Sequence, residues 1–176
     1  MASMLNSGFH SDSNVEVHKF YAGTVILSAI LALALEAFFY KFGRWSEMLD
    51  LPLLVTIYFG VSRRNPSSGL LLGAFIGLLQ DALSSDNPIG MYGIAKTLVG
   101  FVASSVGGKI DTEHPVSRFG LVFFLFYFHQ AVLASVQIML LSRQGTFFSG
   151  HLLLASIVNS AVAVALFALL DRLRKP

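Results

Sequence analysis

The chain has 176 residues, of which 55% are hydrophobic and only 12% carry a charge. Soluble domains carry about 25% charged residues, so this chain lacks the polar side chains that a soluble surface needs. Its formal net charge is +2, and it has no cysteine, which excludes disulfides, thiolate metal sites and cysteine nucleophiles. We therefore interpret the chain as an all-α integral membrane protein with a single domain.

Polar residues fill the first 19 positions, where no basic segment followed by a short apolar core indicates a signal peptide. We expect a short cytoplasmic tail over residues 1–19 and one transmembrane domain over residues 20–176. Six apolar runs follow the tail. Four of them are long enough to cross a bilayer as helices: 20–42, 90–107, 119–141 and 147–170.

The other two apolar runs, 51–61 and 69–83, are shorter than the roughly 20 residues of an ordinary crossing helix. The link between them contains Arg63 and Arg64, and leaving these side chains at mid-bilayer would cost several kcal/mol. We therefore expect both runs to cross as short helices that longer neighbours shield. The predicted fold is a compact bundle of six transmembrane helices.

The distribution of Lys and Arg predicts the orientation of this bundle. With six crossings, eight of these residues fall on one side and three on the other. The eight are Lys19, Arg63, Arg64, Lys109, Arg118, Arg172, Arg174 and Lys175, and the three are Lys41, Arg44 and Arg143. Because positively charged loops stay in the cytoplasm, we expect both termini to be cytoplasmic.

The loops offer no room for a catalytic domain, since the longest covers only residues 108–118. Phosphate-binding, nucleophile-elbow and zinc-protease motifs are missing from the sequence. The five histidines lie far apart on different segments, which argues against a metal site. We expect no enzyme activity, no cofactor, no metal and no nucleic-acid partner.

Small residues recur at four-residue spacing in two runs, which places them on one face of each helix. They are Gly69, Gly73 and Gly77 in the first run, and Gly100, Ser104 and Gly108 in the next. A stripe of this kind lets another helix approach closely. We expect it to serve packing inside the bundle, with a docking face for a separate protein as the alternative.

Three ionisable side chains lie inside the runs, namely Glu36, Asp81 and Lys96, and each needs a partner or water. At about 1.5 Å per residue, all three fall in the outer half of the bundle. Because only residues 84–91 connect the two helices, we expect Lys96 to pair with Asp81, with Glu36 as the second choice. The alternative is a polar site for a small ligand or ion. Further polar side chains lie at middle depths: Gln80, His129, Gln130, Gln137 and Asn159.

Residues 50–108 also contain a series of short motifs. They are Asp50-Leu51-Pro52-Leu53-Leu54, Tyr58-Phe59-Gly60 with the Arg63-Arg64 turn, Gly77-Leu78-Leu79-Gln80-Asp81-Ala82-Leu83, Pro88-Ile89-Gly90 and Ala95-Lys96-Thr97-Leu98-Val99-Gly100. In their order and spacing these motifs resemble the rod shape-determining protein MreD family.

The resemblance implies a multi-spanning inner-membrane component of the bacterial elongation machinery, which directs lateral peptidoglycan synthesis along MreB filaments. It implies a scaffold that binds the bitopic protein MreC and, through it, influences the RodA glycosyltransferase and its partner transpeptidase. It also implies a fold similar to the substrate-binding subunit of energy-coupling-factor transporters, and it leaves a homodimer open. The family supplies no catalytic residue.

The candidate positions are structural or partner-contacting. Those that match the family pattern are Asp50, Pro52, Gln80, Asp81, Gly90 and Lys96, and Glu36, Gly69, Gly73, Gly77 and Gly100 join them on the physical grounds above.

The alternative function is that of a substrate-binding subunit of a small-solute, vitamin-type transporter. Such subunits usually carry an Ala-x-x-x-Ala face on their first helix. Here no two alanines of the segment 22–37 are four residues apart, which favours the scaffold.

Overall fold

The computed structural model describes residues 20–39, 48–84, 88–112, 114–142 and 147–173. Within these ranges the chain forms six α-helices and no strand. They are α1 (Ala22–Phe39), α2 (Leu51–Arg63), α3 (Pro66–Leu83), α4 (Met91–Val106), α5 (Pro115–Leu141) and α6 (Gly150–Asp171). The predicted tail, residues 1–19, lies outside the described residues.

The helices begin where side chains can accept hydrogen bonds from the free backbone N–H groups of the first turn. Asp50 accepts from the Leu53 N–H at 2.8 Å and thereby starts α2. Asn65 starts α3 and Ser149 starts α6 in the same way. The prediction of helices in all six apolar runs is confirmed, although α5 begins four residues before its predicted run.

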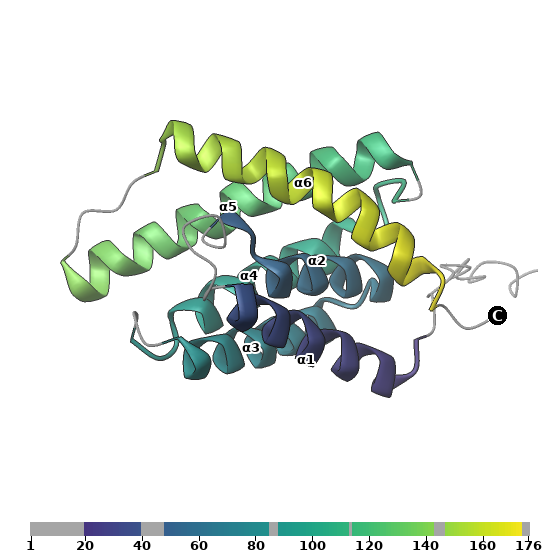
Figure 1. Ribbon diagram of the computed structural model, residues 1–176, viewed down its shortest axis with the longest axis horizontal. Coiled ribbons are helices and arrows are strands. Elements are labelled where there is room, and N and C mark those ends of the chain that lie inside the picture. Colours follow the sequence, from purple (N-terminus) through teal and green to yellow (C-terminus); the bar gives the residue numbers. More distant parts are fainter. Residues whose placement is uncertain (1–19, 40–47, 85–87, 113, 143–146, 174–176) are drawn as a thin grey trace, which may run out of the picture.

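Figure 1 shows α5 and α6 side by side along one side of the molecule, α1 and α3 along the other, and α2 and α4 between them. The start of α1 and the end of α6 lie at the same end of the bundle, on the right of the view. The chain therefore returns, after six helices, to the end from which the first helix starts.

The helices differ in how well they match a membrane. By length and composition, α1, α3, α5 and α6 are apolar enough to cross it, whereas α2 and α4 are shorter. At about 1.5 Å per residue, α2 is only about 20 Å long. All of its residues except Arg63 are buried. The other helices thus surround α2, as predicted for the run 51–61, whereas the run 69–83 lies in α3, which is longer than predicted and only one-third buried.

The closest helix contact is between α3 and α4, along the glycine stripe. An added Cβ on Gly73 would overlap the Lys96 carbonyl, and one on Gly77 would overlap that of Tyr92. An added Cβ on Gly69 would overlap Gly100 and Ser104. The stripe therefore packs within the chain. At its end the structure differs from the expected spacing, because Gly107 rather than Gly108 packs against α2, at Val61.

Candidate functional site

A fully buried lysine is the centre of the polar interior. Lys96 of α4 has no exposed surface, and its Nζ lies 2.6 Å from Asp50 Oδ2. The other carboxylate oxygen of Asp50 caps α2. One carboxylate therefore neutralises the buried ammonium and satisfies the start of a helix. Such a pair is costly to break, because removing one partner leaves the other charge buried and alone.

The predicted partner of Lys96 was wrong. Asp81, the first choice, accepts three backbone hydrogen bonds instead, at 2.9 to 3.0 Å, from Gly90, Tyr92 and Gly93. It thereby caps the N-terminus of α4. Gly90, the residue just before this helix, has a left-handed backbone conformation with a φ of 107°. The Asp81 side chain, which comes from α3, thus contacts the first residues of α4. Lys96 lies more than one turn further along α4.

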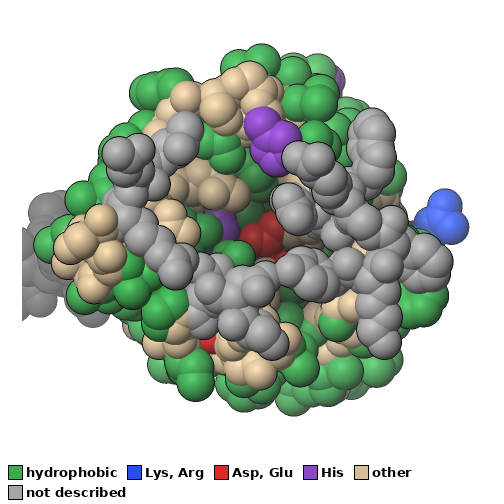
Figure 2. Space-filling view, turned by 60° about the vertical axis from the view of Figure 1, so that its left-hand side comes forward, with side chains coloured by type: hydrophobic (Ala, Val, Ile, Leu, Met, Phe, Trp, Pro, Cys, Tyr) green, Lys and Arg blue, Asp and Glu red, His purple; other side chains and the backbone are tan. Residues whose placement is uncertain are grey.

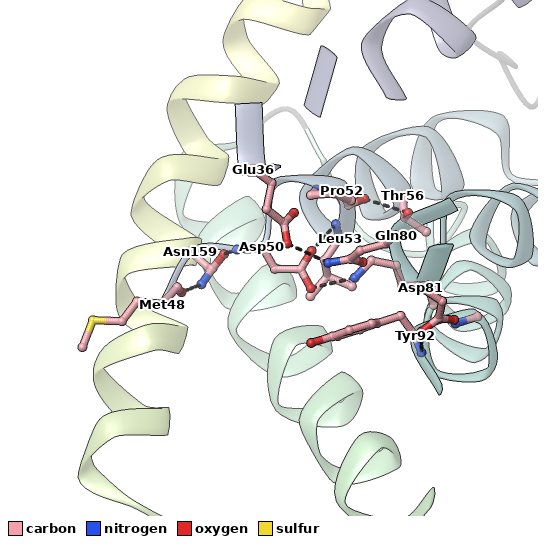
Figure 3. A network of polar contacts seen from close by, with 12 residues as sticks. Glu36, Met48, Asp50, Pro52, Leu53, Thr56, Gln80, Asp81, Tyr92 and Asn159 are labelled. Carbon is pink, nitrogen blue, oxygen red and sulfur yellow. Dashed lines mark hydrogen bonds and ion pairs between the residues drawn. The ribbon is translucent and has the colours of Figure 1, made fainter. Parts of the chain in front are cut away.

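A third element fixes Asp50 in place. Asn159 of α6 is fully buried, and its Oδ1 accepts a hydrogen bond from the Asp50 N–H at 3.0 Å. Its Nδ2 donates to the carbonyl oxygens of Met48 and Ala155. Figure 3 shows Asn159 bridging from α6 to the segment that precedes α2. The ion pair therefore joins α4 to α2, and Asn159 joins both to α6.

The second predicted partner, Glu36 of α1, binds a neutral side chain. Its Oε1 accepts a hydrogen bond from Gln80 Nε2 of α3 at 2.7 Å. Glu36 Oε2 and Gln80 Oε1 are buried and have no hydrogen-bond partner among the described residues. Figure 3 places Glu36, Gln80 and Asp50 close together and facing one another. Each of the first two side chains thus keeps one acceptor oxygen for another partner.

A buried histidine completes the cluster. His129 of α5 has no exposed surface, and neither ring nitrogen has a hydrogen-bond partner among the described residues. Its ring stacks on that of Tyr92, with the centroids 6.3 Å apart. Lys96 Nζ lies 5.3 Å from the centroid of the Tyr92 ring, within range of a cation–π contact. We call Glu36, Asp50, Gln80, Lys96 and His129 the polar cluster.

Glu36 takes no part in the ion pair of the polar cluster. Lys96 and Asp50 compensate each other, and their charges act on both Glu36 and His129. The structure records two ion pairs among the residues it describes, Lys96–Asp50 and Arg118–Asp171. Neither includes Glu36, so an ionised Glu36 gives the polar cluster an excess of one negative charge.

The polar cluster lies toward the end of the molecule that is opposite to the start of α1. Figure 2 views the molecule from that side and shows a hollow with acidic side-chain atoms on its floor and histidine atoms near them. Glu36 is only half-buried, and the Asp50 side chain is 14% exposed. Parts of the Asp50 and Glu36 side chains are thus exposed, although Glu36 Oε2 itself is buried, whereas Lys96 and His129 have no exposed surface.

A separate ion pair fixes the opposite end of the bundle. Arg118 Nη2 lies 2.5 Å from Asp171 Oδ2, so the start of α5 is bound to the end of α6. The Tyr58 hydroxyl of α2 donates to the other oxygen of Asp171 at 2.8 Å. The sequence analysis counted Arg118 as a loop cation and named Tyr58 only as part of a motif, and it predicted neither contact with Asp171. The sequence offers no local signal for partners that lie 53 and 113 residues apart.

The remaining candidates have structural positions. Pro52 occupies the first turn of α2. Backbone N–H groups in a first turn have no partner within the helix, so the N–H that proline lacks costs no helical hydrogen bond. Gly69, Gly73, Gly77 and Gly100 lie in the contact between α3 and α4. Across the described part of the chain, no group of three or more His, Asp or Glu side chains is placed to hold a metal ion. The arrangement joins helices that are far apart in the sequence.

Comparison with protein families identifies the family of this chain. The model of the family described as rod shape-determining protein MreD matches residues 17–173, which include all six helices. Neither the comparison with curated proteins nor that with solved structures gives a match.

Proposed function

This chain belongs to the MreD family of rod shape-determining proteins, and from that membership we propose that it is a non-enzymatic scaffold of the bacterial elongation machinery. In this role it binds an MreC-type protein directly. Through that protein it influences the RodA glycosyltransferase, its partner transpeptidase and MreB filaments. The observation that carries the proposal is the extent of the family match, which covers the whole helical body rather than one motif.

The interior of the molecule supports a scaffold. Its polar groups connect helices that are far apart in sequence: α2 with α4, α2 with α6, and α1 with α3. Networks of this kind hold a bundle in one arrangement, because each polar group must keep its partner in a nonpolar environment. A rigid bundle offers a partner helix a fixed surface. The glycine stripe is used inside the chain, so the partner binds another face.

We also propose that the bundle crosses the inner membrane six times, with both termini in the cytoplasm and with residues 20–176 as one domain. Two observations support this arrangement. First, α2 is too short to match a hydrocarbon core of about 30 Å, but the protein itself surrounds it, so its ends need not reach the lipid surface. Second, eight of the Lys and Arg residues lie on the proposed cytoplasmic side, against three on the other. An architecture of the energy-coupling-factor substrate-subunit type belongs to the same proposal.

Co-purification tests this function. The tagged chain is extracted in mild detergent from its host cell, and the proteins that accompany it are identified. The scaffold predicts an MreC-type protein among them, at a ratio to the bait that stays constant through size-exclusion chromatography. Stable recovery of an ATPase pair without an MreC-type protein would contradict the scaffold and support a transporter subunit.

A matched pair of variants sharpens this experiment. Lys96→Ala removes one partner of the buried ion pair, whereas Ser105→Ala changes an exposed residue of the same helix. If the rigid bundle is what the partner recognises, Lys96→Ala lowers the recovery of the MreC-type protein and Ser105→Ala leaves it unchanged. Equal recovery with both variants would show that binding does not depend on the polar interior.

A further inference from the structure

Three cations gather at the end of the bundle where α2 ends, α3 begins and α4 ends. Arg63 is the last residue of α2 and Arg64 follows it, whereas Lys109 lies just after the end of α4. The two segments meet because Gly107 packs on α2, where an added Cβ would overlap the backbone of Val61. Helix packing therefore brings together cations that are far apart in the sequence. We call Arg63, Arg64 and Lys109 the basic cluster.

The basic cluster is not neutralised within the described part of the chain, because the two ion pairs formed there use other side chains. Arg63 and Arg64 are partly exposed, and Lys109 is exposed. Of the Arg64 guanidinium nitrogens, only Nε is buried without a hydrogen-bond partner among the described residues. Asp111 is an exposed carboxylate two residues after Lys109, and three cations with one carboxylate leave an excess of two positive charges. The basic cluster thus offers an anion both charge and accessible N–H donors.

An exposed apolar stripe on α3 begins beside the basic cluster. The helix starts at Pro66, directly after the turn that holds the two arginines. Leu71, Phe75 and Leu78 are exposed, and their spacing places them on one face of α3. At about 1.5 Å per residue, Leu78 lies about 18 Å from the helix start, which is close to half of a hydrocarbon core of about 30 Å. The stripe therefore matches the length of one lipid leaflet.

We propose that the basic cluster binds the phosphate group of an anionic phospholipid, whose acyl chain lies along the stripe of Leu71, Phe75 and Leu78. Arginine N–H groups match the geometry of phosphate oxygens, and a basic pocket between helix ends at the membrane surface suits an anionic headgroup. The stripe favours a lipid over a soluble phosphate, which would leave these apolar side chains without a contact. The inference requires the proposed membrane crossing but not the scaffold role, so either can fail without the other.

The test uses the full chain in detergent micelles and measures its thermal unfolding. Dioctanoyl phosphatidylglycerol is titrated into the sample. Dioctanoyl phosphatidylcholine is the control with the same acyl chains and no net charge, and glycerol phosphate is the soluble phosphate without acyl chains. Ligand binding to the folded state raises Tm, and a hundredfold excess over Kd corresponds to a rise of about 5–10 °C for a chain of this size.

We expect phosphatidylglycerol to raise Tm and the two other compounds to leave it nearly unchanged. The double variant Arg63→Gln/Arg64→Gln removes two of the three cations and should weaken the binding of phosphatidylglycerol about 25-fold, at about fivefold for each cation. Arg172→Gln is the matched control, because it removes an exposed cation that follows α6 and is not part of the basic cluster. Its affinity should stay within about twofold of that of the unchanged chain.

Four results would overturn the proposal. The first is no rise with phosphatidylglycerol, and the second is an equal rise with phosphatidylcholine, which would show that any lipid binds. The third is an equal rise with glycerol phosphate, which would assign the site to a soluble phosphate. The fourth is an equal loss of affinity in Arg172→Gln and the double variant, which would leave only the net charge of this end of the molecule.

A second variant applies if the double variant does not fold. Lys109→Gln changes an exposed residue outside the helices and should weaken the binding of phosphatidylglycerol about fivefold. An unchanged affinity in Lys109→Gln would then contradict the proposed site.

Discussion

Replacing Lys96 and Asp50 singly and together measures how strongly the buried ion pair holds α4 to α2. Lys96→Met removes the charge and keeps most of the aliphatic volume. Asp50→Asn removes the opposite charge while keeping an oxygen that can cap α2, because Asn is as good an N-cap as Asp. Lys96 has no exposed surface, and its Nζ lies 2.6 Å from Asp50 Oδ2. Each single change therefore leaves the other charge buried without its partner.

Removing one partner of such a pair typically costs about 3–5 kcal/mol, which corresponds to a fall in Tm of roughly 6–20 °C for a chain of this size. The double variant leaves no stranded charge, so we expect it to cost less than the sum of the two single changes by about 2–3 kcal/mol. The assay is thermal unfolding in detergent, followed by loss of helical circular dichroism.

The control cycle combines Lys96→Met with Asp81→Asn. Asp81 binds three backbone N–H groups at the start of α4 and not the lysine, so these two changes should add within about 0.5 kcal/mol. Strict additivity for Asp50 together with strong coupling for Asp81 would refute the assignment of the ion pair.

Three further predictions concern packing, the opposite end and topology. Gly73→Leu forces α3 away from the Lys96 carbonyl and should prevent recovery of folded protein, whereas Gly23→Leu should not, because an added Cβ there meets no other atom. Equal yields of the two variants in fluorescence size-exclusion chromatography would contradict the contact. Asp171→Asn weakens the contacts to both Arg118 and Tyr58 and should lower Tm by several degrees, and an unchanged Tm would show that this ion pair adds no stability. Reporters fused after residue 176 and within residues 63–68 should both read cytoplasmic, and a reporter within residues 84–88 should read external. An external reading at residues 63–68 would rule out the proposed crossings of α2 and α3.

The sequence was most informative where a pattern is local. Long apolar runs define helices by composition alone, and all six are present. Four-residue spacing places the glycines of α3 on one face, and that face meets α4 because the short connection between the two helices makes them neighbours. The shielding of α2 followed from its length and from the arginines that end it.

The sequence was least informative for contacts between distant helices. Lys96 was recognised as a buried charge, but Asp50, which precedes the apolar run 51–61, was not considered as its partner. In the structure α2 is short and enclosed, so its N-terminus reaches the level of Lys96 inside the bundle. Asn159 and Asp171 meet partners more than 100 residues away, and no periodicity encodes such pairs. Their contacts depend on how the helices pack.

Cell shape tests most directly the role in rod shape determination that membership of the MreD family implies. The chain is depleted from its own host under a repressible promoter, and cell length and width are measured by microscopy over several generations. We expect the depleted cells to widen and become round, and re-expression of the chain to restore rods. Cells that keep their length-to-width ratio after the protein has fallen below detection would contradict it.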